Sequence, residues 1–263
     1  MSYAKLTYTL ADQVAVVTMA DEATMNAASL EMVGELALAL EQACDEARAL
    51  VLTGRGRGFC SGANLNNTGP HAAKAREGKF DAGRALDTHY NPFITSLRNL
   101  PIPFVTAVNG AAAGVGCSFA LMGDLIIAGE SAYFLQAFRR IGLVPDGGSS
   151  YLLPRMIGRA RAMEMMLLGE KLPAKTALEW GLINRCVPDE EVMTTALGFA
   201  RELAQGPRSL AMIRQLTWES LDLHFQEQLK REREMQRDAG RTGDFAEGVS
   251  AFLQKRKAAF KGS

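Results

Sequence analysis

The chain has 263 residues, of which 48% are hydrophobic and 22% are charged. This composition excludes a disordered or fibrous protein. Lys and Arg together number 29, as do Asp and Glu, so the formal net charge is zero. A neutral chain has no general attraction for phosphate backbones or anionic lipids, so we expect neither nucleic acid nor a membrane as its main partner.

Four cysteines and three histidines are scattered along the chain without a CxxC pair. This spacing argues against a metal site, and a chain of this length needs no disulfide framework. The first residues, MSYAKLTYTL, lack the basic start and apolar core of a signal peptide. We therefore expect a cytoplasmic protein that needs no metal or redox cofactor.

The first half of the chain alternates strands and helices. Leu6–Leu10 and Val14–Met19 predict a hairpin, whereas Ser29–Ala47 and Val115–Met122 predict helices. Continuous apolar runs predict buried strands at Ala49–Thr53, Phe104–Val108 and Leu125–Ala128. This alternation indicates an α/β architecture with buried parallel strands.

Residues Asn99–Gly123 contain no charged side chain, and this run is long enough to imitate a membrane span. Pro101, Pro103 and the Asn109-Gly110 pair interrupt it, and most of it is Ala and Gly rather than Leu and Ile. We therefore expect a buried strand, a turn and a buried helix here. The polar, Gly-containing stretch from about residue 66 to 87 predicts a mobile loop.

From Gly158 onward the sequence predicts helices separated by Gly and Pro. The first three predicted helices cover Ala160–Leu168, Ala174–Trp180 and Glu190–Ala204. Composition then changes at Gly206-Pro207, which we take as the boundary between a core of residues 1–205 and a helical region of residues 206–263.

The predicted helical region contains the densely charged run QEQLKREREMQRDAGR and a last helix over Phe245–Ala258. Taken alone, such a charge run favours a solvated helix face over a subunit contact.

Two glycine-containing loops lie next to predicted elements: Phe59–Leu65 follows a strand, and Gly110–Gly116 precedes a helix. Glycine lets backbone N–H groups approach a ligand closely, and two N–H groups that converge on one oxygen form an oxyanion hole. On spacing alone, a simpler interpretation is favoured, in which these glycines only permit tight turns and close packing. Neither loop fits a nucleotide-binding motif.

Five segments together resemble the enoyl-CoA hydratase/isomerase (crotonase) superfamily. They are FCSGANL, NGAAAGVGCSFALMGDLIIA, FRRIGLVPDGGSSYLLPRMIG, GEKLPAKTALEWGLINRCV and FLQKRKAAFKG, in the order and spacing of the family. The resemblance implies a crotonase-like spiral of ββα repeats, a C-terminal helical trimerisation region and an acyl-CoA thioester substrate. It also implies a homotrimer or a dimer of trimers, in which coenzyme A is part of the substrate rather than a cofactor.

The resemblance assigns site residues position by position. It implies that the backbone N–H groups of Ala63 and Val115 form the oxyanion hole. It also implies that the substrate or its coenzyme A portion contacts Ser61, Gly62, Asn64, Leu65, Gly114, Ser118 and Phe138. Asn64 stands where the family usually has Asp, and Val115 stands where it usually has Gly.

The two catalytic carboxylates of the hydratases have no counterpart in this chain. The resemblance places them at Ser118 and Phe138, and neither residue can position a water and move its proton as a carboxylate does. A standard hydratase is therefore disfavoured.

One acidic residue remains near these motifs, Asp146 in the segment IGLVPDGG. Pro-Asp-Gly is a common turn sequence, and on that basis alone a structural role is favoured. The resemblance reverses this preference, since the single catalytic acid of the isomerase branches lies in this segment. The surrounding sequence is similar to the 1,2-epoxyphenylacetyl-CoA isomerase group, which is also linked to Δ3,Δ2-enoyl-CoA isomerisation.

The leading hypothesis is thus an acyl-CoA isomerase with Asp146 as its acid/base. An apolar wall that includes Phe138 would raise the pKa of Asp146 toward the working range. Two alternatives remain: an enoyl-CoA hydratase or another crotonase-type lyase, and an acyl-CoA-binding protein without catalytic activity.

Overall fold

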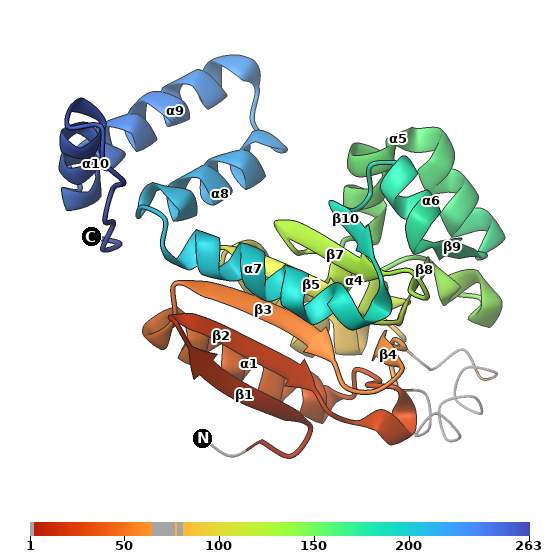
Figure 1. The fold of residues 1–263 in the computed structure, drawn as a ribbon. Coiled ribbons are helices and arrows are strands. Elements are labelled where there is room, and N and C mark those ends of the chain that lie inside the picture. Colours follow the sequence, from red (N-terminus) through yellow and green to blue (C-terminus); the bar gives the residue numbers. More distant parts are fainter. Residues whose placement is uncertain (1–2, 65–76, 78–80) are drawn as a thin grey trace.

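The computed structural model describes residues 3–64, 77 and 81–263 (Figure 1). Its larger sheet contains, in spatial order, β1 (Leu6–Ala11), β2 (Val14–Met19), β3 (Ala49–Gly54), β5 (Phe104–Val108), β7 (Leu125–Gly129) and β10 (Arg185–Val187). Its smaller sheet contains β4 (Gly58–Cys60), β6 (Ala111–Ala113), β8 (Tyr133–Leu135) and β9 (Lys171–Pro173).

The chain runs through these sheets as a spiral. The pairs β3 and β4, β5 and β6, and β7 and β8 are consecutive in sequence, yet each pair contributes one strand to each sheet. Each pair is followed by a helix before the next begins: α3 (Asn91–Arg98), α4 (Val115–Leu121) and α5 (Ser149–Leu168). The predicted spiral of ββα repeats is confirmed.

The N-terminal hairpin is confirmed as well, because β1 and β2 pair antiparallel over their full length. Asp12 and Gln13 connect them with φ values of 52° and 63°, the geometry of a two-residue hairpin turn. Next, α1 (Leu30–Glu46) begins where the Ser29 hydroxyl accepts a hydrogen bond from the Met32 N–H at 3.1 Å.

The strands β2, β3, β5, β7 and β10 pair in parallel. This pairing was expected for β3, β5 and β7 from their continuous apolar runs. One face of this sheet is covered by α7 (Val192–Ala204), which lies across it in Figure 1. Val192, Ala196, Ala200 and Ala204 recur every four residues and pack against the strands. The small alanines let α7 approach the sheet closely.

Several three-residue strands correct the sequence predictions. Gly58–Cys60 was predicted as part of a loop but forms β4, and the segment predicted to be helical from Gly158 onward contains β9 and β10. Three residues are too few for a hydrophobic period to show, so only their neighbours in the sheet reveal such strands. The predicted helix Ala174–Trp180 is observed as α6 (Ala174–Glu179).

Gly158, whose φ is 78° and ψ is 158°, divides α5 into two helices, and the second of them agrees with the predicted helix Ala160–Leu168. The first, which begins at Ser149, was not predicted. The start predicted for the next long helix is wrong, because α7 begins at Val192 rather than Glu190. The last helix, α10 (Gly243–Leu253), ends earlier than predicted, and Lys255 follows with a φ of 54°. Glu190 belongs to a 3₁₀ turn, Asp189–Glu191, that precedes α7, and the left-handed conformation of Lys255 ends the helical path after α10.

Of the predicted mobile loop between residues 66 and 87, positions 66–76 and 78–80 lie outside the described residues. Its end is helical, because Leu86–Tyr90 forms a π-helical turn that leads into α3. The stretch Asn99–Gly123 contains the predicted buried strand, β5, and buried helix, α4, but Ala111–Ala113, expected in the loop between them, forms the additional strand β6. Within the described part of the chain, no helix has the length and apolar character needed to cross a bilayer.

Beyond the sheets, α8 (Ser209–Ser220), α9 (Phe225–Ala239) and α10 form a group to one side of the molecule (Figure 1). The boundary predicted at residue 205 falls in the connection between α7 and α8. That the two parts are separate domains stays a prediction.

Candidate active site

The first glycine loop leaves β4 and is held against residues 24–28. The Ser61 hydroxyl donates to the carbonyl oxygen of Thr24 at 2.8 Å, and the Ala28 N–H donates to the carbonyl oxygen of Gly62 at 2.8 Å. Ala63 follows as an exposed residue, and Asn64 is half-buried. Leu65, predicted to contact coenzyme A, lies outside the described residues.

The second glycine loop joins β6 to α4. Gly114 has a φ of 52° and a ψ of −129°, a conformation that favours glycine, and its N–H donates to the Leu135 carbonyl oxygen at 2.9 Å. Val115 is the first residue of α4, so its N–H has no partner within the helix.

The two loops are in direct contact. A methyl group on Gly62 would lie 2.9 Å from the Ala113 carbonyl oxygen and 3.7 Å from the Gly114 Cα. Ala63 and Val115 each follow one of these touching glycines. No other described residue accepts a hydrogen bond from either N–H. The structure thus places the two predicted N–H donors in adjacent loops, each directly after a glycine of the contact.

Asp146 lies in the turn between the short helical segment Ala137–Ile141 and α5. Its neighbour Gly147 packs on α4, since a methyl group there would lie 2.7 Å from the Ser118 Oγ and 3.3 Å from a methyl carbon of Val115. The Asp146 Oδ1 is buried and has no hydrogen-bond partner among the described residues. Burial alone raises the pKa of Asp146 from 3.8 to about 6.

Phe138 is buried and lies beside the second loop. Its Cζ would be 4.0 Å from a methyl group on Gly114. Apolar surroundings were expected to raise the pKa of Asp146, and burial is indeed the only cause of the observed direction of its shift.

Ser118 is fully buried, and its hydroxyl is bonded to protein atoms. It donates to the Asp146 carbonyl oxygen at 3.1 Å and lies 2.8 Å from the Ser149 hydroxyl. A third buried side chain, Gln136, donates from Nε2 to the Ser149 Oγ at 3.2 Å.

Tyr90 belongs to the same region, although no motif in the sequence singles it out. Its hydroxyl donates to the Ala28 carbonyl oxygen at 2.6 Å. Burial raises the pKa of Tyr90 to about 12, and the negative charges of Cys60 and Asp146 add to this shift. Like Gln136 and Ser149, Tyr90 is separated from the glycine motifs in sequence, so only the fold reveals its position.

The cysteines beside the two loops are not suited to nucleophilic catalysis. Cys60 and Cys117 are both fully buried, and burial raises their pKa values to about 11 and about 12. Both serve as small side chains of the buried core. The described residues also contain no group of three His, Cys, Asp or Glu side chains that could hold a metal ion.

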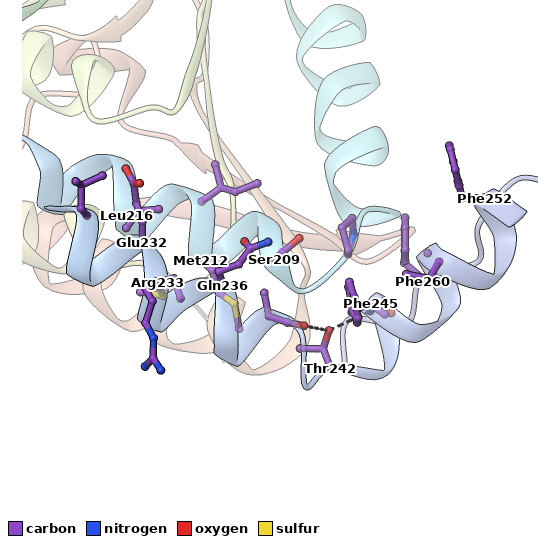
Figure 2. A pocket seen from close by; sticks show the side chains of 18 of the residues that line it. Ser209, Met212, Leu216, Glu232, Arg233, Gln236, Thr242, Phe245, Phe252 and Phe260 are labelled. Carbon is purple, nitrogen blue, oxygen red and sulfur yellow. Dashed lines mark hydrogen bonds between the residues drawn. The ribbon is translucent and has the colours of Figure 1, made fainter.

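A large cavity lies elsewhere, among the C-terminal helices. Its volume is about 900 Å³, and α8, α9 and α10 line it. Figure 2 shows Met212, Gln236 and Phe245 on its walls. Since none of the predicted site residues lines it, this cavity is separate from the loops around Asp146.

Comparisons with known proteins identify relatives over nearly the whole chain. The family model for enoyl-CoA hydratase/isomerase matches residues 9–263. A 1,2-epoxyphenylacetyl-CoA isomerase from Escherichia coli (strain K12) is 45% identical over 246 residues, which cover 90% of this chain and 91% of that protein. A protein named "Probable enoyl-CoA hydratase" from Rhodobacter capsulatus is 42% identical over 263 residues and covers 100% of both chains.

The fold has close counterparts among solved structures. The crystal structure of an enoyl-CoA hydratase from Polaromonas sp. JS666 matches with a TM-score of 0.88 and 32% sequence identity. The match covers 97% of this chain and 99% of that chain.

Proposed function

This chain belongs to the enoyl-CoA hydratase/isomerase family, and from this premise we propose that it is an acyl-CoA isomerase with Asp146 as its catalytic acid/base. The substrate class is an acyl-CoA thioester of the 3-enoyl or the 1,2-epoxyphenylacetyl type. The E. coli relative, which bears the name of an isomerase of the second type, supports this choice.

The observation that carries the proposal is the environment of Asp146. Its carboxyl group has a buried oxygen that finds no hydrogen-bond partner in the described part of the chain. Its pKa of about 6 lets it accept and return a proton near neutral pH. The family resemblance places the two hydratase carboxylates at Ser118 and Phe138, neither of which is acidic, whereas Asp146 is an acid in direct contact with Ser118.

In the proposed reaction, the N–H groups of Ala63 and Val115 bind the thioester oxygen and stabilise the negative charge that it gains as an enolate. The Asp146 carboxylate removes a proton from carbon 2 of a 3-enoyl chain. The electron pair of that C–H bond forms a double bond between carbons 1 and 2, and the carbonyl electron pair moves onto the thioester oxygen, which gives the enolate. The resulting carboxylic acid then returns the proton to carbon 4, which binds it with the electron pair of the old double bond between carbons 3 and 4. In this step the carbonyl group re-forms, and the electron pair between carbons 1 and 2 becomes the new double bond between carbons 2 and 3. One carboxyl group therefore suffices, and no atom is gained or lost.

An enoyl-CoA hydratase is the second candidate, because the Rhodobacter capsulatus relative bears that name. Incubation with a 3-enoyl-CoA and, separately, with a 2-enoyl-CoA distinguishes the two activities. An isomerase converts the first into a conjugated 2-enoyl-CoA, which absorbs in the ultraviolet, whereas a hydratase adds water to the second. A protein that only binds acyl-CoA turns over neither. Rapid hydration of the 2-enoyl-CoA without isomerisation would overturn the proposal.

We also propose that no metal or redox cofactor takes part, since the proton shift balances without one. The same assay tests this point when it is repeated after treatment with EDTA. Turnover lost on chelation and restored by a divalent ion would contradict it.

We further propose that α8–α10 pack against other copies of this chain in a homotrimer or a dimer of trimers. These helices carry large apolar side chains in the open, with exposed fractions of 73% for Phe225, 82% for Phe252 and 74% for Leu253. Cyclic association buries such surfaces without leaving an open edge.

A further inference from the structure

Three buried polar side chains from three separate elements form a connected chain behind Asp146. Ser118 comes from α4, Ser149 is the first residue of α5, and Gln136 follows β8. All three are 0% exposed. Fully buried polar groups are costly unless they are hydrogen-bonded, so a chain of this kind needs a structural or functional reason.

The number of available hydrogens determines which group donates in each hydrogen bond of this network. Gln136 Nε2 donates to the Ser149 Oγ, and the Ser118 hydroxyl donates its one hydrogen to the Asp146 carbonyl oxygen. The contact of 2.8 Å between the two hydroxyls must therefore use the hydrogen of Ser149. The donors run from Gln136 through Ser149 and Ser118 to the backbone of Asp146.

This hydrogen-bond network ends at Asp146, where it reaches the backbone and not the carboxyl group. The Asp146 carbonyl oxygen accepts from the Ser118 hydroxyl and from the Ser149 N–H, each at 3.1 Å. In contrast, the Asp146 Oδ1 has no partner among the described residues. The backbone therefore determines where the carboxyl group lies.

The two residues after Asp146 are glycines, so the backbone here needs contacts with other elements to hold its conformation. Gly147 and Gly148 have φ values of 57° and 81°, and glycine has little conformational preference of its own. Gly147 also fits closely against Ser118, because any side chain there would meet its Oγ at 2.7 Å.

We propose that Ser118 and Ser149 are positioning residues for Asp146, which hold its backbone so that its carboxyl group stays placed for proton transfer. This inference rests on the proposed isomerase function. It gives Ser118, at the position of a hydratase carboxylate, a role in placing a different carboxyl group. Misplacement of a reacting group by about 1 Å can cost as much as 10²-fold in rate.

The test compares kcat, KM and the pH dependence of turnover on a 3-enoyl-CoA for Ser118→Ala, Ser149→Ala and the double variant. Ser118→Ala should lower kcat about tenfold with little change in KM, since orientation and not binding is lost. Ser149→Ala should cost less, about threefold, because the Ser118 hydroxyl can still reach the carbonyl oxygen. The double variant should resemble Ser118→Ala, as expected for residues of one network.

A matched control is Thr106→Val. Thr106, in β5, is also fully buried, and its hydroxyl donates to the Ala120 carbonyl oxygen at 2.9 Å. Ala120 lies on α4, the helix that carries Ser118, but two residues further along it. This variant should lose stability comparable to that lost by Ser118→Ala and keep its kcat. The apparent pKa on the acid side of the plot of turnover against pH should change in Ser118→Ala and should stay at the wild-type value in Thr106→Val.

Asp146→Asn, assayed in parallel, distinguishes failure of the proposed function from failure of the positioning role alone. If Asp146→Asn keeps its turnover, the proposed function is wrong and the positioning role falls with it. If Asp146→Asn is inactive while folded Ser118→Ala and Ser149→Ala keep the wild-type kcat and this apparent pKa, only the positioning role is wrong. An equal loss of kcat in Thr106→Val would also overturn it, since the effect would then be general loss of rigidity.

Discussion

The Arg214 guanidinium of α8 and the Asp124 carboxylate, which precedes β7, form a buried ion pair with 2.8 Å between Nε and Oδ2. The Arg214 side chain is only 4% exposed. Its other N–H groups donate to the carbonyl oxygens of Leu97, Arg98 and Leu100, at the end of α3. A helix leaves its last carbonyl groups unpaired, and a cation there is favourable. One arginine thus attaches the C-terminal helices to the core.

Arg214→Ala should lower the free energy of unfolding by about 3–5 kcal/mol, because it leaves Asp124 buried without its cation and three carbonyl groups without donors. Urea unfolding followed by circular dichroism measures this. The control is Arg201→Ala, which removes an exposed pair with Asp12 and should cost less than about 1 kcal/mol. Equal stability of the two variants would show that the Arg214 contacts do not hold the helices in place.

Gly62→Ala should damage the contact between the two glycine loops. Its φ is 104°, and the new methyl group would lie 2.9 Å from the Ala113 carbonyl oxygen, so one loop must move. Loss of one N–H donor typically costs about 10²–10³-fold in kcat, and we expect a loss of that order on a 3-enoyl-CoA.

The control for this prediction is Gly34→Ala in α1, where a methyl group meets nothing within 4 Å. It should keep full activity and gain about 0.5–1 kcal/mol in stability. If folded Gly62→Ala has wild-type kcat, the two loops do not form the proposed oxyanion hole.

The sequence predicted the long elements of this fold well and the short ones poorly. The boundaries of Phe104–Val108 were correct because a continuous apolar run between turn signals leaves few alternatives. The strand Ala111–Ala113 was missed, since three alanines have no period and only the parallel neighbours β4 and β8 make them a strand. Local sequence carries little information about such long-range pairing.

The candidate site shows the same division. Ala63, Val115 and Asp146 were predicted because they lie within motifs that resemble a known family. Gln136 and Tyr90 were not found, because their importance depends on contacts with residues distant in sequence. A buried hydrogen-bond chain is a property of the packed structure.

Phe252→Asp should dissociate the proposed trimer without unfolding the chain. Phe252 is 82% exposed in the single chain, so a charge there costs little until the surface is buried against another copy. Light scattering at micromolar protein concentration should find an oligomer for the wild type and a smaller species for Phe252→Asp. Leu38→Asp, at a residue of α1 that is 46% exposed, is the matched control and should leave the oligomer intact. A monomeric wild type would contradict the prediction.

Asp146→Asn should make the protein more stable at neutral and alkaline pH. Because burial raises the pKa of Asp146 from 3.8 to about 6, the folded state binds more protons than the unfolded state between these values. The wild type therefore loses stability as the pH rises from about 4 to about 6. The uncharged amide avoids this loss.

Thermal unfolding at a series of pH values measures the difference between wild type and Asp146→Asn. The advantage of the variant should be largest above about pH 7 and should vanish below about pH 4, where the wild-type carboxyl group is neutral in both states. A difference in stability between the two proteins that stays constant from low to high pH would mean that burial does not destabilise the ionised form of Asp146.

The same substitution should abolish most catalysis while leaving substrate binding intact. The amide keeps the size of the side chain and is equally suited to a turn, but it cannot accept the proton from carbon 2. A positioned acid/base typically contributes about 10²–10⁴-fold, so kcat on a 3-enoyl-CoA and on 1,2-epoxyphenylacetyl-CoA should fall by that amount. The wild-type kcat/KM should rise with pH through the Asp146 pKa of about 6, since only the carboxylate accepts a proton. A purely structural Asp146 predicts the opposite, namely near-normal turnover by Asp146→Asn on every substrate that the wild type converts.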